Sequence, residues 1–446
     1  MKKVSKHLTQ TQMIVLGYFL IIVIGAGLLT LPIATKSGVS TPFIDALFTS
    51  TSAVCVTGLV IADTFTYWSV FGQLVIITII QIGGLGFMTI GVFFAIILRR
   101  KIGLWTRGTL QESVNILEVG GIVRLAKKII VGTIFFEGLG AALLAIRFSS
   151  QMNFGKAVYF GVFHSISAFC NAGFDLMGEH GLYSSFVPYY DDWLVNLVIM
   201  SLIVIGGIGF FVWNDVSENK FHFKKYRLHT KIVLITTAVL IFGGAAILFF
   251  LERNNTIADM SVSDGILCSL FGSVTARTAG FNTVDTASLT EGSKLVTCIL
   301  MFIGGSPGST AGGVKTTTFV ILFFYTIANL RQSEHCNIFG RRLEGEAIRK
   351  ASVVMFINLS LITLGVIIIT TVQPLDITDV VLEVTSAMGT VGMSTGITRQ
   401  LETISKIVLI FIMYCGRVGS MTFAFSLRGQ KIEPPVKLPV EKVMIG

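Results

Sequence analysis

Four short, weakly apolar segments of related sequence recur along the chain, and each ends at or just after a glycine. They are TSAVCVTGL at 51–59, ISAFCNAGF at 166–174, VTARTAGF at 274–281 and TSAMGTVGM at 385–393, with the glycines at positions 58, 173, 280 and 392. A nearly constant spacing of about 110 residues is typical of one structural unit used four times. If four such loops meet at one axis, their backbone carbonyls can coordinate a cation there.

The loops contain no carboxylate over 51–60, 166–174, 273–282 or 385–394. Ion ligands in them must therefore be main-chain carbonyls, with threonine hydroxyls as a supplement. A carbonyl cage replaces the hydration shell of a monovalent cation without fixed charge, whereas divalent sites usually recruit carboxylates, so the loops favour potassium over calcium. The alternative, that the glycines only let membrane helices pack closely, is disfavoured because the pattern occurs four times.

Arg277 is the one charged residue in these loops, three places before Gly280. A fixed cation in the conduction path would repel a cationic substrate. We therefore expect the Arg277 side chain to point behind its loop, toward an acid such as Glu383 or Asp175.

A second glycine-rich segment interrupts an apolar run in the third unit. It consists of Gly304, Gly305, Ser306, Pro307, Gly308, Ser309, Thr310, Ala311, Gly312 and Gly313, and Lys315 follows closely. Five glycines and a proline cannot continue a helix, so we expect an irregular segment about midway across the membrane that acts as a flexible barrier. The alternative is a packing kink. The near match to a phosphate-binding loop is one residue out of register and lacks a preceding strand, so nucleotide binding is not expected.

Two more ionisable residues, Glu137 and Arg417, fall inside apolar runs, where burial is costly unless they are paired or wet. Arg417 follows Gly392 by the same number of residues that separates Gly280 from Gly305, which predicts a similar depth. Arg417 can then donate hydrogen bonds to free carbonyls of the irregular segment. An ion pair between Arg417 and Glu137 is the alternative.

The elements that must position these residues are long apolar runs. Eight runs are long enough to cross about 30 Å of hydrocarbon, and they lie near 13–33, 70–98, 129–148, 193–213, 231–251, 294–328, 351–373 and 404–427. Each pair of runs encloses a shorter one, too short to cross, at 42–54, 157–169, 263–275 or 377–388. Each short run leads into a glycine loop, so it is predicted to be a re-entrant helix.

Composition supports a polytopic membrane protein of 446 residues, with 52% hydrophobic and 13% charged residues and a mean hydropathy of +0.78. The first run is read as a membrane helix rather than a signal peptide. The net charge of +9 does not indicate nucleic acid, because most lysines and arginines lie on alternate connections, which the positive-inside rule places in the cytoplasm together with both termini. The six cysteines show neither metal-ligand spacing nor a disulfide pattern.

The predicted fold is an all-α polytopic membrane protein with eight crossings, in which four linked units of span, pore helix and span surround a central ion pore in a pseudo-tetramer. The predicted organisation is a cytoplasmic tail at 1–12, pore units at 13–98, 99–213, 214–328 and 329–427, and a cytoplasmic tail at 428–446. The second unit includes a cytoplasmic connection, and the third contains the irregular segment.

Together, the four loops, GGLGF at 83–87, GGIGF at 206–210, GGSPGSTAGGVKTT at 304–317 and GRVG at 416–419 resemble the Trk/Ktr/HKT superfamily of potassium transporters. The resemblance covers essentially the whole chain and is nearest to the bacterial Ktr membrane subunit, because few residues precede the first unit. It implies a channel-like fold in the plasma membrane, potassium uptake often stimulated by sodium as an activator, no organic cofactor on this chain, a homodimer, and gating by a cytosolic ring of nucleotide-binding (RCK/KTN-type) subunits.

The resemblance also implies roles for individual residues. The selectivity filter would consist of Val56, Thr57, Gly58, Asn171, Ala172, Gly173, Thr278, Ala279, Gly280, Thr390, Val391 and Gly392, which bind K⁺ through backbone carbonyls. The gate would consist of residues 304–313 with Lys315 and Arg417. Some sodium-preferring relatives carry serine at the first filter glycine, so four glycines favour potassium.

A sodium-selective or Na⁺/K⁺ symporting transporter is the alternative function. An enzyme is not expected, because the one pair that suggests catalysis, His164 with Asp175, has no nucleophile pattern nearby. A receptor or scaffold would need large soluble domains, which the sequence lacks.

Overall fold

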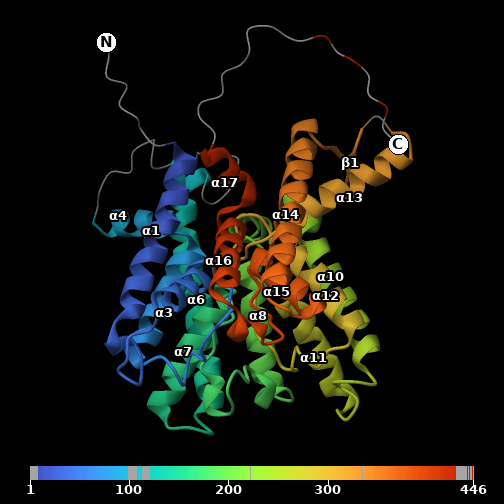
Figure 1. Ribbon diagram of the computed structural model, residues 1–446. Coiled ribbons are helices and arrows are strands. Elements are labelled where there is room, and N and C mark those ends of the chain that lie inside the picture. Colours follow the sequence, from blue (N-terminus) through green and yellow to red (C-terminus); the bar gives the residue numbers. More distant parts are fainter. Residues whose placement is uncertain are drawn as a thin grey trace, which may run out of the picture.

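The computed structural model describes residues 9–98, 108–112, 121–220, 222–333 and 335–427, together with residues 439, 441 and 444. Residues 1–8 of the predicted N-terminal tail, most of the predicted C-terminal tail and most of residues 99–120 lie outside the described residues, and residues 10–12 belong to the first helix. Helices supply nearly all of the regular structure in the described part, and the longest ones run side by side along one direction (Figure 1).

Four helices are long and apolar enough to cross a membrane as single elements. They are α1 (Gln10–Thr30), α6 (Ile122–Phe148), α10 (Leu228–Glu252) and α14 (Gly345–Val372). Helix α1 begins earlier than its apolar run because Thr9 and Gln12 form a capping box. The outward side chains of these helices are apolar and well exposed, for example Phe242 at 68% and Phe356 at 74%. Such a surface suits a lipid environment.

A short apolar helix follows each long one and packs against it. These helices are α2 (Phe43–Val54), α7 (Phe154–Phe169), α11 (Val262–Thr275) and α15 (Ile377–Gly389). The side chains of Asn153, Ser261 and Asp376 accept backbone N–H groups at the starts of α7, α11 and α15. Each short helix ends where a glycine loop begins, as the sequence predicts.

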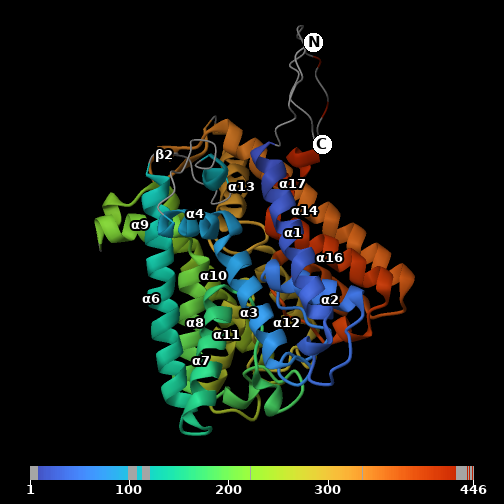
Figure 2. The same ribbon diagram turned by 90° about the vertical axis from the view of Figure 1, so that its left-hand side faces the viewer.

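Three of the predicted second crossings are not straight. The runs at 70–98, 193–213 and 404–427 form the pairs α3 (Val70–Leu85) with α4 (Phe87–Ile97), α8 (Trp193–Gly207) with α9 (Phe210–Asn219) and α16 (Thr403–Val418) with α17 (Ser420–Leu427), bent by 93°, 95° and 97°. A glycine with positive φ lies at each bend: Gly86 (79°), Gly209 (96°) and Gly419 (92°). Residues with a Cβ resist this conformation, so glycine permits the right angle. Figure 2 shows α4 lying across the upper end of α3.

The predicted crossing at 294–328 is interrupted by an irregular segment, as the sequence predicts. It consists of α12 (Glu291–Phe302), an irregular segment at 303–315, and α13 (Thr316–Leu330). The segment leaves and returns at nearly the same place, because Ile303 and Val314 form an isolated parallel bridge. Helix α13 then runs sideways beside the hairpin of β1 (Asn337–Ile338) and β2 (Arg341–Arg342), where Asn337 pairs with Arg342 (Figure 1).

By length and composition, the described residues contain four single spans, or seven if each bent pair counts as one. The eighth predicted crossing is the interrupted α12 and α13. Short 3₁₀ helices occur in the connections: η1 (Pro32–Ala34), η2 (Met177–Glu179), η3 (Val187–Tyr189), η4 (Phe223–Lys225) and η5 (Ile397–Gln400).

Contacts between the four predicted units follow one rule. The second helix of each unit packs on the short helix of the next, as α3 on α7, α8 on α11, α12 on α15 and α16 on α2. This order runs along the chain and returns from the last unit to the first. The ends of the chain's helical part meet as well, because the Gln12 amide donates to the Ser426 carbonyl at 3.1 Å.

Candidate ion pathway

The four glycine loops share one backbone conformation. Each glycine has positive φ: Gly58 (91°), Gly173 (70°), Gly280 (82°) and Gly392 (94°). The residue two places earlier is also left-handed although it is not glycine: Val56 (57°), Asn171 (59°), Thr278 (74°) and Thr390 (51°). Four non-glycine residues with positive φ at matching positions are unusual and require support from the surrounding structure.

The four loops touch one another in a closed ring. A Cβ added to any of the four glycines would collide with the carbonyl oxygen just before the next glycine: Gly58 with Ala172 (2.6 Å), Gly173 with Ala279 (2.6 Å), Gly280 with Val391 (2.3 Å) and Gly392 with Thr57 (2.2 Å). The last contact returns to the first loop. The twelve residues predicted to coordinate the ion therefore lie together, and no glycine of the ring has room for a side chain.

Hydroxyl groups at the ends of the short helices hold the loops in place. In the first and fourth loops, the glycine N–H donates to a serine six residues earlier, from Gly58 to Ser52 at 3.1 Å and from Gly392 to Ser386 at 3.0 Å. In the other two, Ser167 and Thr275 donate to the carbonyl just after the glycine, at 2.6 Å in both cases. Sequence analysis missed these four residues, although a serine six places before the glycine recurs in three loops.

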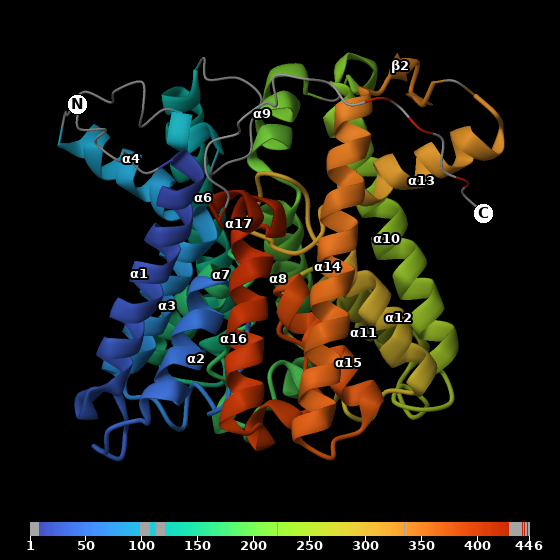
Figure 3. The same cartoon turned by 45° about the horizontal axis from the view of Figure 1, so that its top comes forward.

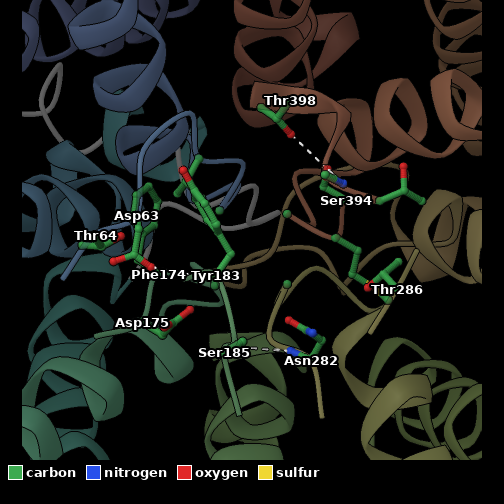
Figure 4. A pocket seen from close by; sticks show the side chains of 18 of the residues that line it. Asp63, Thr64, Phe174, Asp175, Tyr183, Ser185, Asn282, Thr286, Ser394 and Thr398 are labelled. Carbon is green, nitrogen blue, oxygen red and sulfur yellow. Dashed lines mark hydrogen bonds between the residues drawn. The ribbon is translucent and has the colours of Figure 1, made fainter. Parts of the chain in front are cut away.

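A cavity of about 110 Å³ lies against the ring on one side. Its lining includes all four glycines, and Figure 4 shows Asp63, Asp175, Tyr183, Ser394 and Thr398 around it. The Asp63 carboxylate is held by the backbone N–H groups of Thr66 (2.8 Å) and Tyr183 (3.1 Å). Three carboxylates line this cavity, those of Asp63, Asp175 and Asp285, against the one guanidinium of Arg399, and this excess of negative charge attracts cations.

Asp175 sits in a loop beyond the ring, and its carboxylate accepts the Met177 N–H at 2.9 Å. Burial raises the pKa of Asp175 to about 7, against the effect of the Met177 hydrogen bond, and the negative charge of Asp63 adds to the rise. The carboxylate is therefore charged above pH 7 and becomes neutral as the pH falls below it. His164 lies apart from this chemistry, because its Nε2 accepts the Leu176 N–H at 3.0 Å and its Nδ1 contacts the Phe160 carbonyl.

The irregular segment at 303–315 lies directly against the ring on its other side. A Cβ added to Gly312 would come within 2.1 Å of the Thr390 hydroxyl. The segment also binds the elbow between α8 and α9, through Ser306 N–H to Gly207 O (3.0 Å), Thr310 N–H to Gly206 O (3.3 Å) and Phe210 N–H to Gly308 O (2.8 Å). It forms the central loop in Figure 3, between α8, α14 and α17.

Two cationic side chains secure this segment. Arg417 donates to the Thr310 carbonyl and, from the first unit, to the carbonyls of Gly83 and Gly84. Lys315 donates to the carbonyls of Ala311 at 2.6 Å and Gly312 at 3.3 Å. The segment is thus tied to other units, and a larger cavity of about 560 Å³, lined by Gly308, Ser309, Lys315 and Arg417 among others, lies beyond it.

The structure corrects one expectation about buried charges and rules out one alternative. Arg277 points behind its loop, but it does not pair with Glu383 or Asp175: one guanidinium nitrogen approaches the Thr237 hydroxyl at 3.4 Å, and another has no partner among the described residues. Nor does Arg417 pair with Glu137, which instead accepts the Gln81 amide at 3.1 Å. Glu137 lies between the first two units and is held by Gln81, and Asp175 accepts an N–H group of its own loop.

One contact links the ring to the irregular segment. The Thr310 hydroxyl donates to the side-chain oxygen of Asn171, 3.0 Å away, and lies 3.1 Å from the Phe169 carbonyl. The Asn171 amide in turn lies 3.4 Å from the Thr278 hydroxyl. Asn171 therefore joins the second loop, the third loop and the segment. No group of His, Cys, Asp and Glu suited to a metal ion occurs in the part of the chain that the structure describes.

Comparisons with known proteins agree with this arrangement. Residues 2–431 match the TrkH family, described as cation transport proteins. The chain is 39% identical to the potassium/sodium uptake protein NtpJ of Enterococcus hirae, covering 100% of this chain and 99% of that protein. It is 42% identical to the Ktr system potassium uptake protein B of Bacillus subtilis, covering 98% and 97%. The fold is similar to that of the potassium transporter TrkH from Vibrio parahaemolyticus, with a TM-score of 0.74 and 18% identity, covering 96% of this chain and 87% of that one.

Proposed function

The chain belongs to the TrkH family of cation transport proteins, and we propose that it takes up potassium through a central pore. In this proposal the four glycine loops select the ion. It is a membrane transporter rather than an enzyme. In the proposed architecture, four units at 13–98, 99–213, 214–328 and 329–427 form a pseudo-tetramer with eight crossings. The closed ring of glycine contacts is the observation that carries this proposal.

Potassium is the proposed substrate because the ring offers carbonyl oxygens and no carboxylate. Such ligands replace the hydration shell of a monovalent cation and bind it weakly enough for release. The three carboxylates of the outer cavity lie outside the ring and concentrate cations at its entrance. An inside-negative potential then drives uptake, with about 2.3 kcal/mol per charge for each 100 mV.

The segment at 304–313, with Lys315 and Arg417, is the proposed gate. It separates the ring from the larger cavity and carries the positive charges of two side chains close to the path, so it opposes cation flow while it stays docked. We further propose that the protein works as a homodimer in the plasma membrane with both termini cytoplasmic. A cytosolic ring of nucleotide-binding subunits would control the gate, and sodium would act as an activator.

A sodium-selective or sodium-coupled transporter is the second candidate, because the relative from E. hirae is a potassium/sodium uptake protein. Uptake of Rb⁺ and of ²²Na⁺ into proteoliposomes with a diffusion potential distinguishes the two functions. We expect Rb⁺ to enter about tenfold or more faster than Na⁺. Equal rates, or ²²Na⁺ uptake that accompanies Rb⁺ uptake in a fixed ratio, would favour the second candidate.

The same assay tests the ring itself through Gly58→Ser and Gly392→Ser. The added side chains meet a neighbouring carbonyl oxygen, so the preference for Rb⁺ over Na⁺ should fall about tenfold or more. Gly27→Ser is the matched control, because a Cβ at Gly27 of α1 meets nothing within 4 Å. Unchanged preference in both ring variants would remove these glycines from the pathway.

A further inference from the structure

A buried carboxylate behind the fourth glycine loop has no ion-pair partner among the described residues. Glu383 lies in the middle of α15, and its side chain is fully buried. One carboxylate oxygen contacts the Thr398 hydroxyl, and the other has no partner among the described residues. Burial of a charged carboxylate without compensation is strongly unfavourable, so Glu383 requires either a proton or a cation.

Hydroxyl groups of one loop surround this carboxylate. The Thr398 hydroxyl lies 3.0 Å from that of Ser394, which also accepts the Gly396 N–H at 2.9 Å and lies within reach of Glu383. The Thr395 hydroxyl is buried and has no partner in the described structure. Ser394, Thr395 and Thr398 all line the outer cavity, so an ion entering from that cavity can reach them (Figure 4).

The basic side chains nearby are already engaged. Lys294 pairs with Asp379 at 3.2 Å and with Glu291 at 3.1 Å. The Arg399 guanidinium lies over the Tyr183 ring, 3.7 Å from its centre. No described lysine or arginine lies within 4.0 Å of the Glu383 carboxylate. Arg399 acts on the Glu383 charge only from beyond that distance, so no protein cation forms an ion pair with it in the part of the chain that the structure describes.

We propose that Glu383, Ser394 and Thr398 bind a sodium ion taken from the outer cavity, at a site separate from the glycine ring. One carboxylate with neutral hydroxyl oxygens suits a monovalent cation, because divalent sites recruit more charge. The Ser394 and Thr398 hydroxyl oxygens lie 3.0 Å apart, and two oxygens this close suit the short metal–oxygen distances of sodium better than the longer ones of potassium.

The site has a direct route to the ring. Ser386, one turn after Glu383 on α15, accepts the Gly392 N–H at 3.0 Å. An ion that joins α15 to residues 394–398 fixes the chain on both sides of Gly392, and so holds the fourth loop in its conducting form. This regulatory effect rests on the proposed function, whereas sodium binding itself does not.

Thermal unfolding of the purified full-length protein in detergent tests the binding. Potassium is kept at one saturating concentration so that the ring stays occupied, and NaCl replaces choline chloride at constant ionic strength. The wild-type midpoint should rise saturably by about 2 to 4 °C, because the ion binds only the folded state. Glu383→Gln should abolish the rise. Glu252→Gln is the control, because the Glu252 carboxylate is already filled by Thr256, Asn255 and Thr290, and this variant should keep the rise.

Two results would overturn the site. The first is a wild-type midpoint that does not respond to sodium, and the second is a full response in Glu383→Gln, which would mean that sodium binds elsewhere and that the Glu383 carboxylate is not its ligand. If Glu383→Gln does not fold, Thr398→Val serves in its place and should weaken the apparent sodium affinity at least about fivefold, with an unchanged affinity counting against the site. Sodium stimulation of Rb⁺ uptake should disappear in the same variants. Failure of Rb⁺ uptake in the wild type would count against the transport function alone.

Discussion

The glycine ring and the irregular segment at 303–315 lie against each other, yet they are assembled in opposite ways. All four units contribute equivalent backbone to the ring, each with the same two left-handed residues and the same contact to its neighbour. The segment comes from the third unit alone, while the other three units bend sharply at Gly86, Gly209 and Gly419. An ion cage needs equivalent oxygens on all sides, whereas a movable barrier needs one part that differs from the rest.

The two constrictions also differ in what stabilises them. Serine and threonine hydroxyls with backbone amides hold the ring, so no formal charge is involved. The segment is held by the charged side chains of Lys315 and Arg417. Substitutions in the ring should therefore impair conduction, and substitutions that release the segment should increase it.

The largest effect is expected for Gly280→Ala. The new Cβ would lie 2.3 Å from the Val391 carbonyl oxygen, at a φ of 82° that alanine resists. Rb⁺ uptake should fall by about 100-fold or more, measured in proteoliposomes with equal protein content. Gly243→Ala on α10, where a Cβ meets nothing within 4 Å, should keep wild-type uptake. Near-normal uptake in Gly280→Ala would mean that the contacts of the ring do not define the path.

Release of the segment by Arg417→Gln should come next. The side chain loses hydrogen bonds to Thr310, Gly83 and Gly84, and hydrogen bonds from a charged donor are worth about 1.5–3 kcal/mol each. Basal Rb⁺ uptake without a regulatory partner should rise about tenfold. Arg417→Lys keeps the charge but reaches fewer acceptors, so its uptake should lie between the two. A decrease in uptake for Arg417→Gln would contradict the role of the segment as a barrier.

A smaller rise, about threefold, is expected for Lys315→Met, which removes two donors to carbonyls within the same segment. Lys350→Met provides the control, because Lys350 lines the same cavity but pairs with Glu346 at 2.7 Å. Basal Rb⁺ uptake by the two variants can be compared in one assay. Equal rises in the two variants would mean that the loss of positive charge from the cavity, and not the release of the segment, increases Rb⁺ uptake.

The smallest effect concerns pH at the outer entrance. The pKa of Asp175 is raised to about 7, so its negative charge is present above pH 7 and is lost as the external pH falls. Rb⁺ uptake at low ionic strength should decrease about twofold between pH 8 and pH 6, because the entrance attracts cations less strongly. Asp175→Asn should show low uptake without this dependence. If Asp175→Asn kept the wild-type pH profile, another group would be responsible.

Features encoded by the positions of glycines between apolar runs could be predicted from the sequence. The four loops, the short helices before them and the irregular segment each follow from glycine positions between apolar runs, and Arg417 does reach a carbonyl of the segment as expected. The ring's role in selection stays a prediction. The roles of Ser52 and Ser386 could also have been predicted by comparing the four loops, because each serine lies six residues before its loop glycine.

Features that depend on the direction in which a helix or a side chain points could not be predicted from the sequence. A single glycine such as Gly209 inside an apolar run is typical of close helix packing, and nothing local distinguishes it from a right-angled bend. The predicted partner of Arg277 was wrong because the side chain points toward α10. Its contact there, Thr237, comes from a distant part of the sequence. The contact between Asn171 and Thr310 joins residues of two units and has no local pattern.

That contact couples two properties that are usually discussed separately. A displacement of Thr310 is transmitted through Asn171 to the glycine ring, so any movement of the proposed gate also perturbs the carbonyl oxygens that we propose select the ion. Transport rate and ion selectivity therefore depend on the same contact, and a variant whose segment stays undocked should also be less selective.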